Sequence, residues 1–307
     1  MQAAQAPQIK ASRIVLDWMK FPNEQFDYSK PMRVLVNGVI GSGKSAFLES
    51  LAEQYLIRGN NVADLYGTSA GEGLAWLRSP WVTGHQLSVL LIKGNTDVKC
   101  RWPVKHYEDV RLEDFEKNRI VISTTPLYNS RGEEYKADSE LMKLFDKRIG
   151  YPFFIYGLIR EAKYLVYARI KFDEATKGTK STGIDLITQS RHHGFCLGLD
   201  SQRSNSIDLE IRDLLSYRIY KSMGNMTTSI DDYYYSFWRP QWVARMRPGQ
   251  FGIISSTGNV GRGFNEYVTW HKRERENLLR ALDIQVKYTE EKRRKSKEDK
   301  ESDSDKP

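Results

Sequence analysis

The sequence predicts an α/β fold in which a mainly parallel sheet is flanked by helices. Short apolar runs of strand length alternate with helical segments along the 307 residues, and such alternation is typical of parallel sheets. Two of these runs, residues 153–159 and 195–199, are apolar without interruption, as expected for strands that are buried on both faces. The third observation is a glycine-rich loop that stands between a predicted strand and a predicted helix.

The glycine-rich loop spans residues 38–45 and reads G-x-x-x-x-G-K-S. Residues 33–37 predict a short buried strand before it, and residues 46–57 predict a helix after it with its apolar residues on one face. In such a loop the backbone N–H groups bind phosphate, the lysine reaches the β/γ oxygens and the hydroxyl ligates Mg²⁺. We therefore expect ATP and Mg²⁺ as cofactors and Ser45 as the metal ligand. The expected nucleotide-binding residues are Gly38, Val39, Ile40, Gly41, Ser42, Gly43, Lys44, Ser45 and Ala46.

The other elements follow in order along the chain. Residues 61–66 predict a second strand, and residues 84–93 and 119–125 predict two more that are separated by a long polar insertion. Residues 139–148 predict a helix. After the two uninterrupted apolar strands, residues 250–254 predict the strand that closes the sheet. In a mainly parallel sheet, a ligand binds outside the carboxyl ends of the strands.

Composition divides the chain into four parts. Residues 1–30 predict a loosely attached N-terminal arm with a short helix around residues 13–19, and residues 31–258 form the core. Residues 259–286 predict a helical appendage, and residues 287–307 a disordered charged tail. The net charge is +8, of which the tail contributes only +1. The basic excess therefore belongs to the folded body and favours an anionic partner such as DNA.

Two features bear on the location of the protein. The most apolar long stretch, residues 151–172, is interrupted by five charged residues, so no membrane span is expected. Cys100 and Cys196 have neither disulfide nor metal-ligand spacing, and the N-terminus lacks a secretion signal. Together these features favour the cytoplasm.

A nucleotide hydrolase also needs a carboxylate at the end of a buried strand next to the loop-bearing strand. Glu161, which follows the apolar strand 153–159, is the first choice for the general base. Asp173 and Glu174 form the alternative pair. The short stretch before that pair carries two cationic side chains that would point into a packed sheet, which disfavours it. The choice between Glu161 and this pair stays open.

Polar residues also flank the apolar strand 195–199. Gln202 follows this strand, where its amide can contact the γ-phosphate and report hydrolysis to the protein. Arg191 precedes the strand and Arg203 follows it. Either guanidinium can stabilise charge on a phosphate, including the phosphate of a neighbouring subunit.

Together these motifs resemble the HerA/FtsK superfamily of DNA-pumping ATPases. The likeness spans roughly residues 32–254 and includes the glycine-rich loop, Glu-Ala after an apolar strand, Ser-Arg-His-His-Gly at 190–194 and Asp-Ser-Gln-Arg at 200–203. Within the superfamily, the chain most resembles archaeal and viral packaging-type ATPases and the zonular-occludens-like ATPases of filamentous phages. The resemblance implies a RecA-like P-loop core, a homo-oligomeric, hexameric ring and ATP-driven movement of DNA.

The resemblance also implies a role for individual residues. Lys44 and Ser45 match the phosphate-loop pair of the family. Glu161 matches the catalytic glutamate, Gln202 matches the sensor glutamine, and Arg191 occupies the position of an arginine before the sensor strand.

One position departs from the family pattern. If Glu161 is the catalytic residue, Arg160 stands where the family usually has an aspartate, and Mg²⁺ would then depend on Ser45, water and phosphate alone. A nucleotide-gated DNA-binding or assembly scaffold with slow or no hydrolysis therefore stays open beside a translocase for genome packaging or plasmid transfer. A switch GTPase is disfavoured, because no guanine-reading Asn-Lys-x-Asp segment follows the core.

Overall fold

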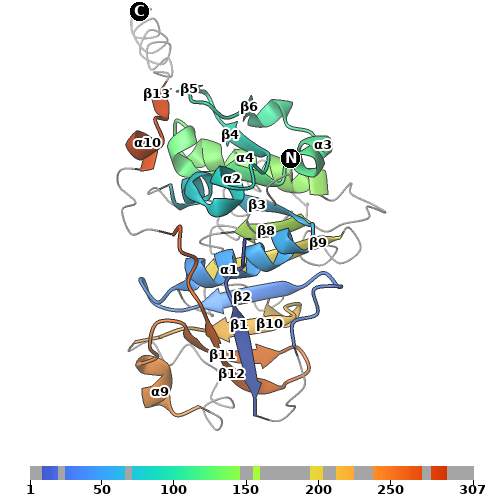
Figure 1. Ribbon diagram of the computed structural model, residues 1–307, viewed down its shortest axis with the longest axis vertical. Coiled ribbons are helices and arrows are strands. Elements are labelled where there is room, and N and C mark those ends of the chain that lie inside the picture. Colours follow the sequence, from blue (N-terminus) through green and yellow to red (C-terminus); the bar gives the residue numbers. More distant parts are fainter. Residues whose placement is uncertain are drawn as a thin grey trace, which may run out of the picture.

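The computed structural model describes residues 9–19, 25–65, 71–145, 155–159, 194–202, 212–224, 238–271 and 278–288. Eleven described strands form one large sheet, and they are β1 (Ile14–Trp18), β2 (Arg33–Asn37), β3 (Asn61–Leu65), β4 (Val89–Lys93), β6 (Val104–His106), β7 (Ile120–Ser123), β8 (Ile155–Ile159), β9 (Phe195–Ser201), β10 (Tyr217–Tyr220), β11 (Gln250–Ser255) and β12 (Val260–Asn265). Their order is β1-β12-β11-β10-β2-β9-β8-β3-β7-β4-β6, along the long axis of the molecule (Figure 1). A second sheet pairs β5 (Thr96–Lys99) with β13 (Gln285–Tyr288).

The greater part of the large sheet is parallel. From β10 through β2, β9, β8, β3, β7 and β4 to β6, every neighbouring pair runs in the same direction. At the other end, β10, β11, β12 and β1 pair antiparallel. The structure therefore confirms the predicted α/β class with a mainly parallel sheet.

The strands next to β2 are β9 and β10. β8 pairs with β9 and β3 and lies one strand further from β2. The expectation that the strand preceding Glu161 adjoins the loop-bearing strand is therefore wrong. Both β8 and β9 are short apolar runs, and such runs carry no signal for their order within a parallel sheet.

Helices flank the sheet. They are α1 (Lys44–Ile57), α2 (Pro80–Thr83), α3 (Leu112–Lys117), α4 (Arg131–Phe145), α9 (Pro240–Ala244) and α10 (Leu278–Ala281), with the 3-10 helices η1 (Glu72–Arg78), η2 (Tyr107–Asp109) and η3 (Thr125–Leu127). α1 connects β2 to β3, which are separated in the sheet by β9 and β8. The helix consequently packs across all four strands.

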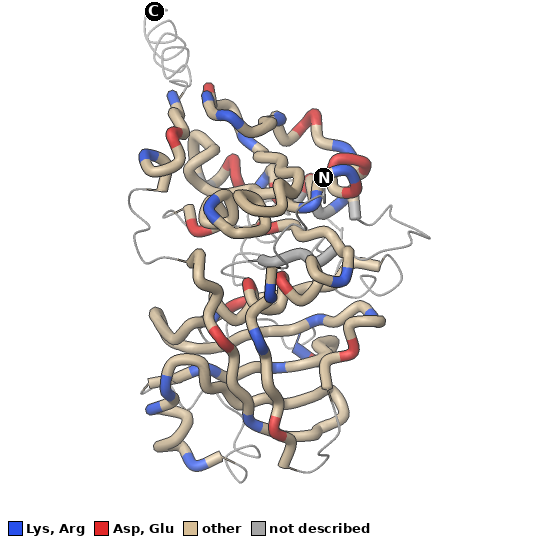
Figure 2. The backbone as a smooth tube through the Cα atoms, in the orientation of Figure 1, with Lys and Arg blue, Asp and Glu red and all other residues tan. Residues whose placement is uncertain are grey.

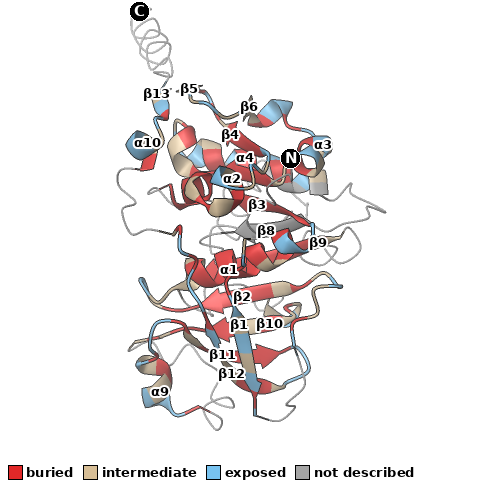
Figure 3. Cartoon of the chain, in the orientation of Figure 1, coloured by how far each residue is buried: buried red, intermediate tan, exposed pale blue. Residues whose placement is uncertain are grey.

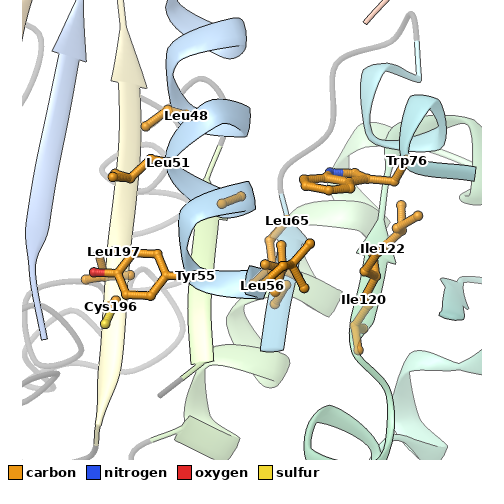
Figure 4. Packing of buried hydrophobic residues seen from close by; sticks show 14 of the residues in the cluster. Leu48, Leu51, Tyr55, Leu56, Leu65, Trp76, Ile120, Ile122, Cys196 and Leu197 are labelled. Carbon is orange, nitrogen blue, oxygen red and sulfur yellow. The ribbon is translucent and has the colours of Figure 1, made fainter. Parts of the chain in front are cut away.

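The core of the molecule forms around α1. Figure 4 shows Leu51 and Tyr55 on the side of β9 that carries Leu197, whereas Leu56 lies near Leu65 of β3. The helix is buried nearly all round rather than on one face, as the burial colours of Figure 3 also show. A helix that is covered on all sides needs its polar residues bonded internally, and the carboxylates of α1 meet this requirement as described below.

The N-terminal segment forms a strand instead of the expected short helix around residues 13–19. In β1, Ile14 and Leu16 are half-buried and Trp18 is buried, whereas Val15 and Asp17 are exposed. This alternation has the period of a strand, and β1 pairs antiparallel with β12. Five residues are too few for periodicity to separate a strand from a helix, which explains the wrong prediction.

Several expected boundaries also move. β4 begins at Val89 instead of residue 84, because Gly84 ends α2 with its N–H donating to the Pro80 carbonyl at 2.8 Å. α4 begins at Arg131 instead of residue 139, and the polar insertion before β7 contains β5, β6 and α3. β11 does not close the sheet, since β12 and β1 continue it.

The predicted boundaries of the helical appendage and the charged tail stay predictions, although the structure describes the first two residues of the tail. Lys287 and Tyr288, which the sequence placed in the charged tail, belong to β13. Residues 289–307 lie outside the described residues. In the part of the chain that the structure describes, no helix has both the length and the apolar character needed to cross a bilayer.

Candidate functional site

The loop of residues 38–45 begins at the carboxyl edge of the parallel sheet and is held from both sides. The Gly38 N–H donates to the carbonyl of Ser201, which ends β9, at 3.2 Å. The Val39 N–H donates to the carbonyl of Ser222, which follows β10, at 3.0 Å. The neighbouring strands of β2 thus fix the start of the loop at the place where ligands of parallel sheets bind.

Glycine is required at two positions of this loop. Gly43 has a φ of +88°, and a Cβ there would overlap the phenol ring of Tyr267. A Cβ at Gly38 would approach the Cβ of Lys221 to 2.8 Å. The tip of the loop is open, since Ile40 is 79% exposed. The loop can therefore lie close to a ligand while its base is packed.

The Lys44 side chain folds back onto the loop. Its Nζ donates to the Val39 carbonyl at 3.2 Å, so the ammonium group lies within the curve of the chain. α1 begins at this residue, with the Phe47 N–H bonding the Gly43 carbonyl at 3.0 Å. An ammonium group at a helix N-terminus is an arrangement that binds an oxyanion such as phosphate.

A carboxylate that the sequence analysis missed lies against Ser45. The Ser45 hydroxyl donates to Oε2 of Glu72 at 3.1 Å, and Glu72 is only 3% exposed. Glu72 opens η1, in the connection that follows β3. The available signal was the run Tyr-Gly-Thr-Ser-Ala-Gly-Glu-Gly at residues 66–73, in which one acidic residue stands among small ones directly after a strand.

Buried aromatic side chains hold η1 in place. The Trp76 indole N–H donates to Oδ2 of Asp64 at 2.9 Å, which ties η1 to β3. The ring of Trp76 also packs on Trp270, with 4.4 Å between the ring centroids. Gly71, which precedes Glu72, has a φ of +70° and turns the chain into η1. The position of Glu72 is therefore set by the core.

The residues that the sequence singled out divide into two groups. Gln202 is described: it is half-buried and follows Ser201, whose carbonyl accepts the Gly38 N–H, so it stands at the same sheet edge as the loop. Five others lie outside the described residues, and their roles stay predictions: Glu161, Asp173, Glu174, Arg191 and Arg203.

The oxygen donors at the site fit a Mg²⁺ ion that arrives with a nucleotide. Mg²⁺ prefers oxygen ligands and retains several waters, so one or two protein groups with phosphate oxygens complete its shell. Ser45 presents a hydroxyl and Glu72 a carboxylate, 3.1 Å apart. Within the described residues, no group of three or more His, Cys, Asp or Glu side chains forms a separate metal cluster.

Two further carboxylates of α1 lie at four-residue intervals behind Ser45. Glu49 is fully buried and bonds the His271 imidazole at 2.9 Å. Glu53 accepts the indole N–H groups of Trp81 and Trp270, both at 2.9 Å. It also accepts the backbone N–H of Ser12 at 2.8 Å and the Ser12 hydroxyl. These bonds attach the N-terminal segment, α2 and residues 270–271 to the helix that carries the loop.

Lys221 lies buried below the loop, at the end of β10. Its backbone N–H donates to the Asn37 carbonyl at 2.8 Å, and its Nζ donates to the side chain of Asn265 and to the Gly249 carbonyl. The Nζ also lies 5.4 Å from the ring centroid of Phe47 and 5.3 Å from that of Phe251. Burial lowers the pKa of Lys221 from its ordinary 10.5 to about 7.

We expect the buried Lys221 to make stability rise with pH between about 7 and 10. In this window the unfolded chain binds a proton that the folded chain does not, so raising the pH favours the folded state, by at most about 1.4 kcal/mol for each pH unit. Urea denaturation at pH 7, 8 and 9 measures this slope. The Lys221→Met variant should lack it, whereas Lys143→Met, at an exposed ion pair with Glu140, should retain it. Parallel curves for wild type and Lys221→Met would contradict the expectation.

Comparison with known proteins finds similarity of structure. No protein-family model matches the chain, and no curated protein matches its sequence. The genome packaging NTPase B204 of Sulfolobus turreted icosahedral virus 2, solved with sulfate, is 13% identical with a TM-score of 0.46, over 76% of this chain and 96% of that chain. The pCW3 conjugation coupling protein TcpA, solved as a monomer with ATPγS, is 16% identical with a TM-score of 0.46, over 90% of this chain and 72% of that one.

A third similar structure is the cytoplasmic domain of the type VII secretion ATPase EccC from Thermomonospora curvata. It is 13% identical with a TM-score of 0.48, and the alignment covers 87% of this chain and 30% of that chain. These structures are of the HerA/FtsK P-loop ATPase type, which the sequence resembles. The strand order, rather than these alignments, defines the fold of this chain.

Proposed function

We propose that this chain is a Mg²⁺-dependent ATPase of the HerA/FtsK superfamily with a RecA-like core, which moves DNA through a homo-oligomeric, hexameric ring in the cytoplasm. The observation that carries the proposal is the loop of residues 38–45. It starts between two parallel strands at the carboxyl edge of the sheet, places Lys44 inside its curve, and leads into the N-terminus of α1. This combination of strand, loop and helix suits the phosphates of a nucleotide.

The loop residues have separate tasks in the proposed reaction. Backbone N–H groups of the loop and the Lys44 ammonium bind the β- and γ-phosphates, and the Ser45 hydroxyl is a ligand of Mg²⁺. Mg²⁺ held there would supply positive charge that stabilises the phosphates during the reaction. Glu161 accepts a proton from the attacking water as the bond between the γ-phosphorus and the bridging oxygen breaks, giving ADP and phosphate. Gln202 contacts the γ-phosphate, and Arg191 or Arg203 reaches a neighbouring subunit's nucleotide.

A scaffold that binds nucleotide but hydrolyses it slowly remains the second candidate. The observation that favours it is Arg160, where the resembling family has an aspartate. Both functions need the same loop, and they differ in turnover. Steady-state ATPase activity that rises on adding DNA supports the motor, whereas tight binding without turnover supports the scaffold.

The end of the sheet that carries α9 suits a nucleic-acid backbone. Residues 212–224 and 238–271 contain seven Lys and Arg residues and only two Asp and Glu. Arg239, Arg245 and Arg247 are exposed on either side of α9, and Figure 2 shows cationic residues at this end of the molecule. Close by, the Arg262 guanidinium lies 4.5 Å from the ring centroid of Trp242. Exposed arginines with an adjacent aromatic ring fit the phosphates and bases of DNA.

We expect Lys44→Ala to abolish ATP binding, because it removes the cation at the β/γ-phosphates. Isothermal titration with ATPγS and Mg²⁺ measures the affinity. Lys143→Ala, which removes an exposed cation paired with Glu140, should bind as the wild type does. A folded Lys44→Ala variant of unchanged affinity would refute the assigned loop.

We expect Glu161→Gln to retain ATP binding while it lowers hydrolysis by roughly 10²-fold or more, since the water loses its proton acceptor. The Asp173→Asn, Glu174→Gln double variant should stay within a few-fold of the wild type. Phosphate release at saturating ATP compares the two. A dead double variant beside an active Glu161→Gln variant would move the general base to the alternative pair.

We expect DNA to stimulate hydrolysis, and the Arg239→Ala, Arg245→Ala, Arg247→Ala triple variant to lose most of the stimulation. Each lost phosphate contact should reduce the slope of log affinity against log salt by about 0.9 for duplex DNA. The control replaces Lys99, Lys117 and Arg280, which are exposed at the other end of the sheet (Figure 1). Equal salt slopes for the two triple variants would exclude α9 as the DNA-contacting surface.

A further inference from the structure

We propose that Glu72 is the carboxylate that positions Mg²⁺ at the nucleotide site. The inference rests on the proposed function, because it assigns the metal environment of the same site. Glu72 lies in the connection after β3, whereas the family resemblance places the catalytic carboxylate after β8. The contact between Ser45 and Glu72 carries it.

The geometry of that contact suits a metal site. The Ser45 hydroxyl, which the loop motif assigns to the metal, donates its hydrogen bond to Oε2 of Glu72 at 3.1 Å. A hydroxyl whose hydrogen is directed at a carboxylate keeps its oxygen lone pairs for a cation. Partners that orient a metal ligand in this way also raise its basicity. Glu72 therefore stands where a carboxylate can orient the serine and bind a water of the metal.

The Glu72 side chain is buried. Glu72 is 3% exposed, and a carboxylate that is withdrawn from water is costly unless polar groups or cations compensate it. A divalent cation beside Ser45 would place an opposite charge next to this carboxylate. The nucleotide brings that cation into a site where Glu72 already stands.

The segment that carries Glu72 is packed on the core. Glu72 lies at the start of η1, which Trp76 anchors through its bond to Asp64 and its packing on Trp270. A Cβ at Gly73 would lie 3.2 Å from Ile122 of β7, so the turn beside Glu72 fits closely on the sheet. The backbone at Glu72 is consequently held in place by the core.

The residue that follows β8 differs from a metal ligand. β8 ends at Ile159, and the next residue is an arginine, whose guanidinium cannot ligate a cation. In P-loop ATPases a carboxylate assists the loop hydroxyl in holding Mg²⁺. Within the described residues, Glu72 is the carboxylate that bonds the Ser45 hydroxyl.

The test measures how nucleotide binding depends on Mg²⁺. The affinity of the full chain for a fluorescent ATP analogue is titrated over Mg²⁺ concentration and, separately, in EDTA. For Glu72→Gln we expect the Mg²⁺ concentration at half-maximal binding to rise about 10-fold or more, with no loss of affinity in EDTA. The matched control is Glu134→Gln on α4, a fully buried carboxylate that accepts the Thr125 hydroxyl away from Ser45, and it should titrate as the wild type does.

The outcomes separate the inference from the proposed function. Mg²⁺-dependent binding by the wild type with an unchanged Mg²⁺ titration for Glu72→Gln would overturn the inference and leave the ATPase proposal standing. No nucleotide binding by the wild type would overturn both. If Glu72→Gln does not fold, Glu72→Asp answers the question, because it keeps the charge but withdraws the carboxylate by one methylene. A raised Mg²⁺ requirement for Glu72→Asp supports the inference, and an unchanged one overturns it.

Discussion

The parallel pairing of β2 with both β9 and β10 is the constraint on which the candidate site depends. Asn37, the last residue of β2, is in register with Ser201 of β9 and with Tyr220 of β10. The residues that directly follow these three strands therefore lie side by side at one edge of the sheet. They are Gly38, Gln202 and Lys221. Because β9 and β8 lie between β2 and the parallel strand β3, the chain needs a long crossover from β2 to β3, and α1 provides it.

The buried charges around α1 follow from its central position. Because the helix is covered on all sides, Glu49 and Glu53 face indole, imidazole and backbone donors instead of water. Removing a hydrogen-bond partner and leaving a buried polar group unsatisfied typically costs about 1–3 kcal/mol, and more for a charged group. These bonds connect α1 to the N-terminal segment and to residues 270–271, so the helix behind the loop is held by distant parts of the chain. A firmly held helix keeps Lys44 and Ser45 in place for a ligand.

Local sequence patterns predicted the parts of the site that consist of consecutive residues. The G-x-x-x-x-G-K-S motif marks the turn between β2 and α1, and the uninterrupted apolar run predicts β9, so the position of Gln202 after a strand was expected, while its role stays a prediction. Glu72 and Lys221 were missed because their importance arises from pairing between segments far apart in the chain. Likewise, four residues of β10 give too little periodicity to identify a strand, and β10 is recognised by its pairing with β2.

Hydrogen–deuterium exchange with and without ATPγS and Mg²⁺ tests the central claim most directly, because it locates the bound nucleotide on the chain. If nucleotide binds at the carboxyl edge of β2, the amides of residues 38–46 should exchange markedly more slowly when it is bound, and those around Glu72 should follow. The Lys44→Ala variant should show neither change. Protection confined to segments away from residues 38–46, or equal protection in Lys44→Ala, would contradict the assigned site.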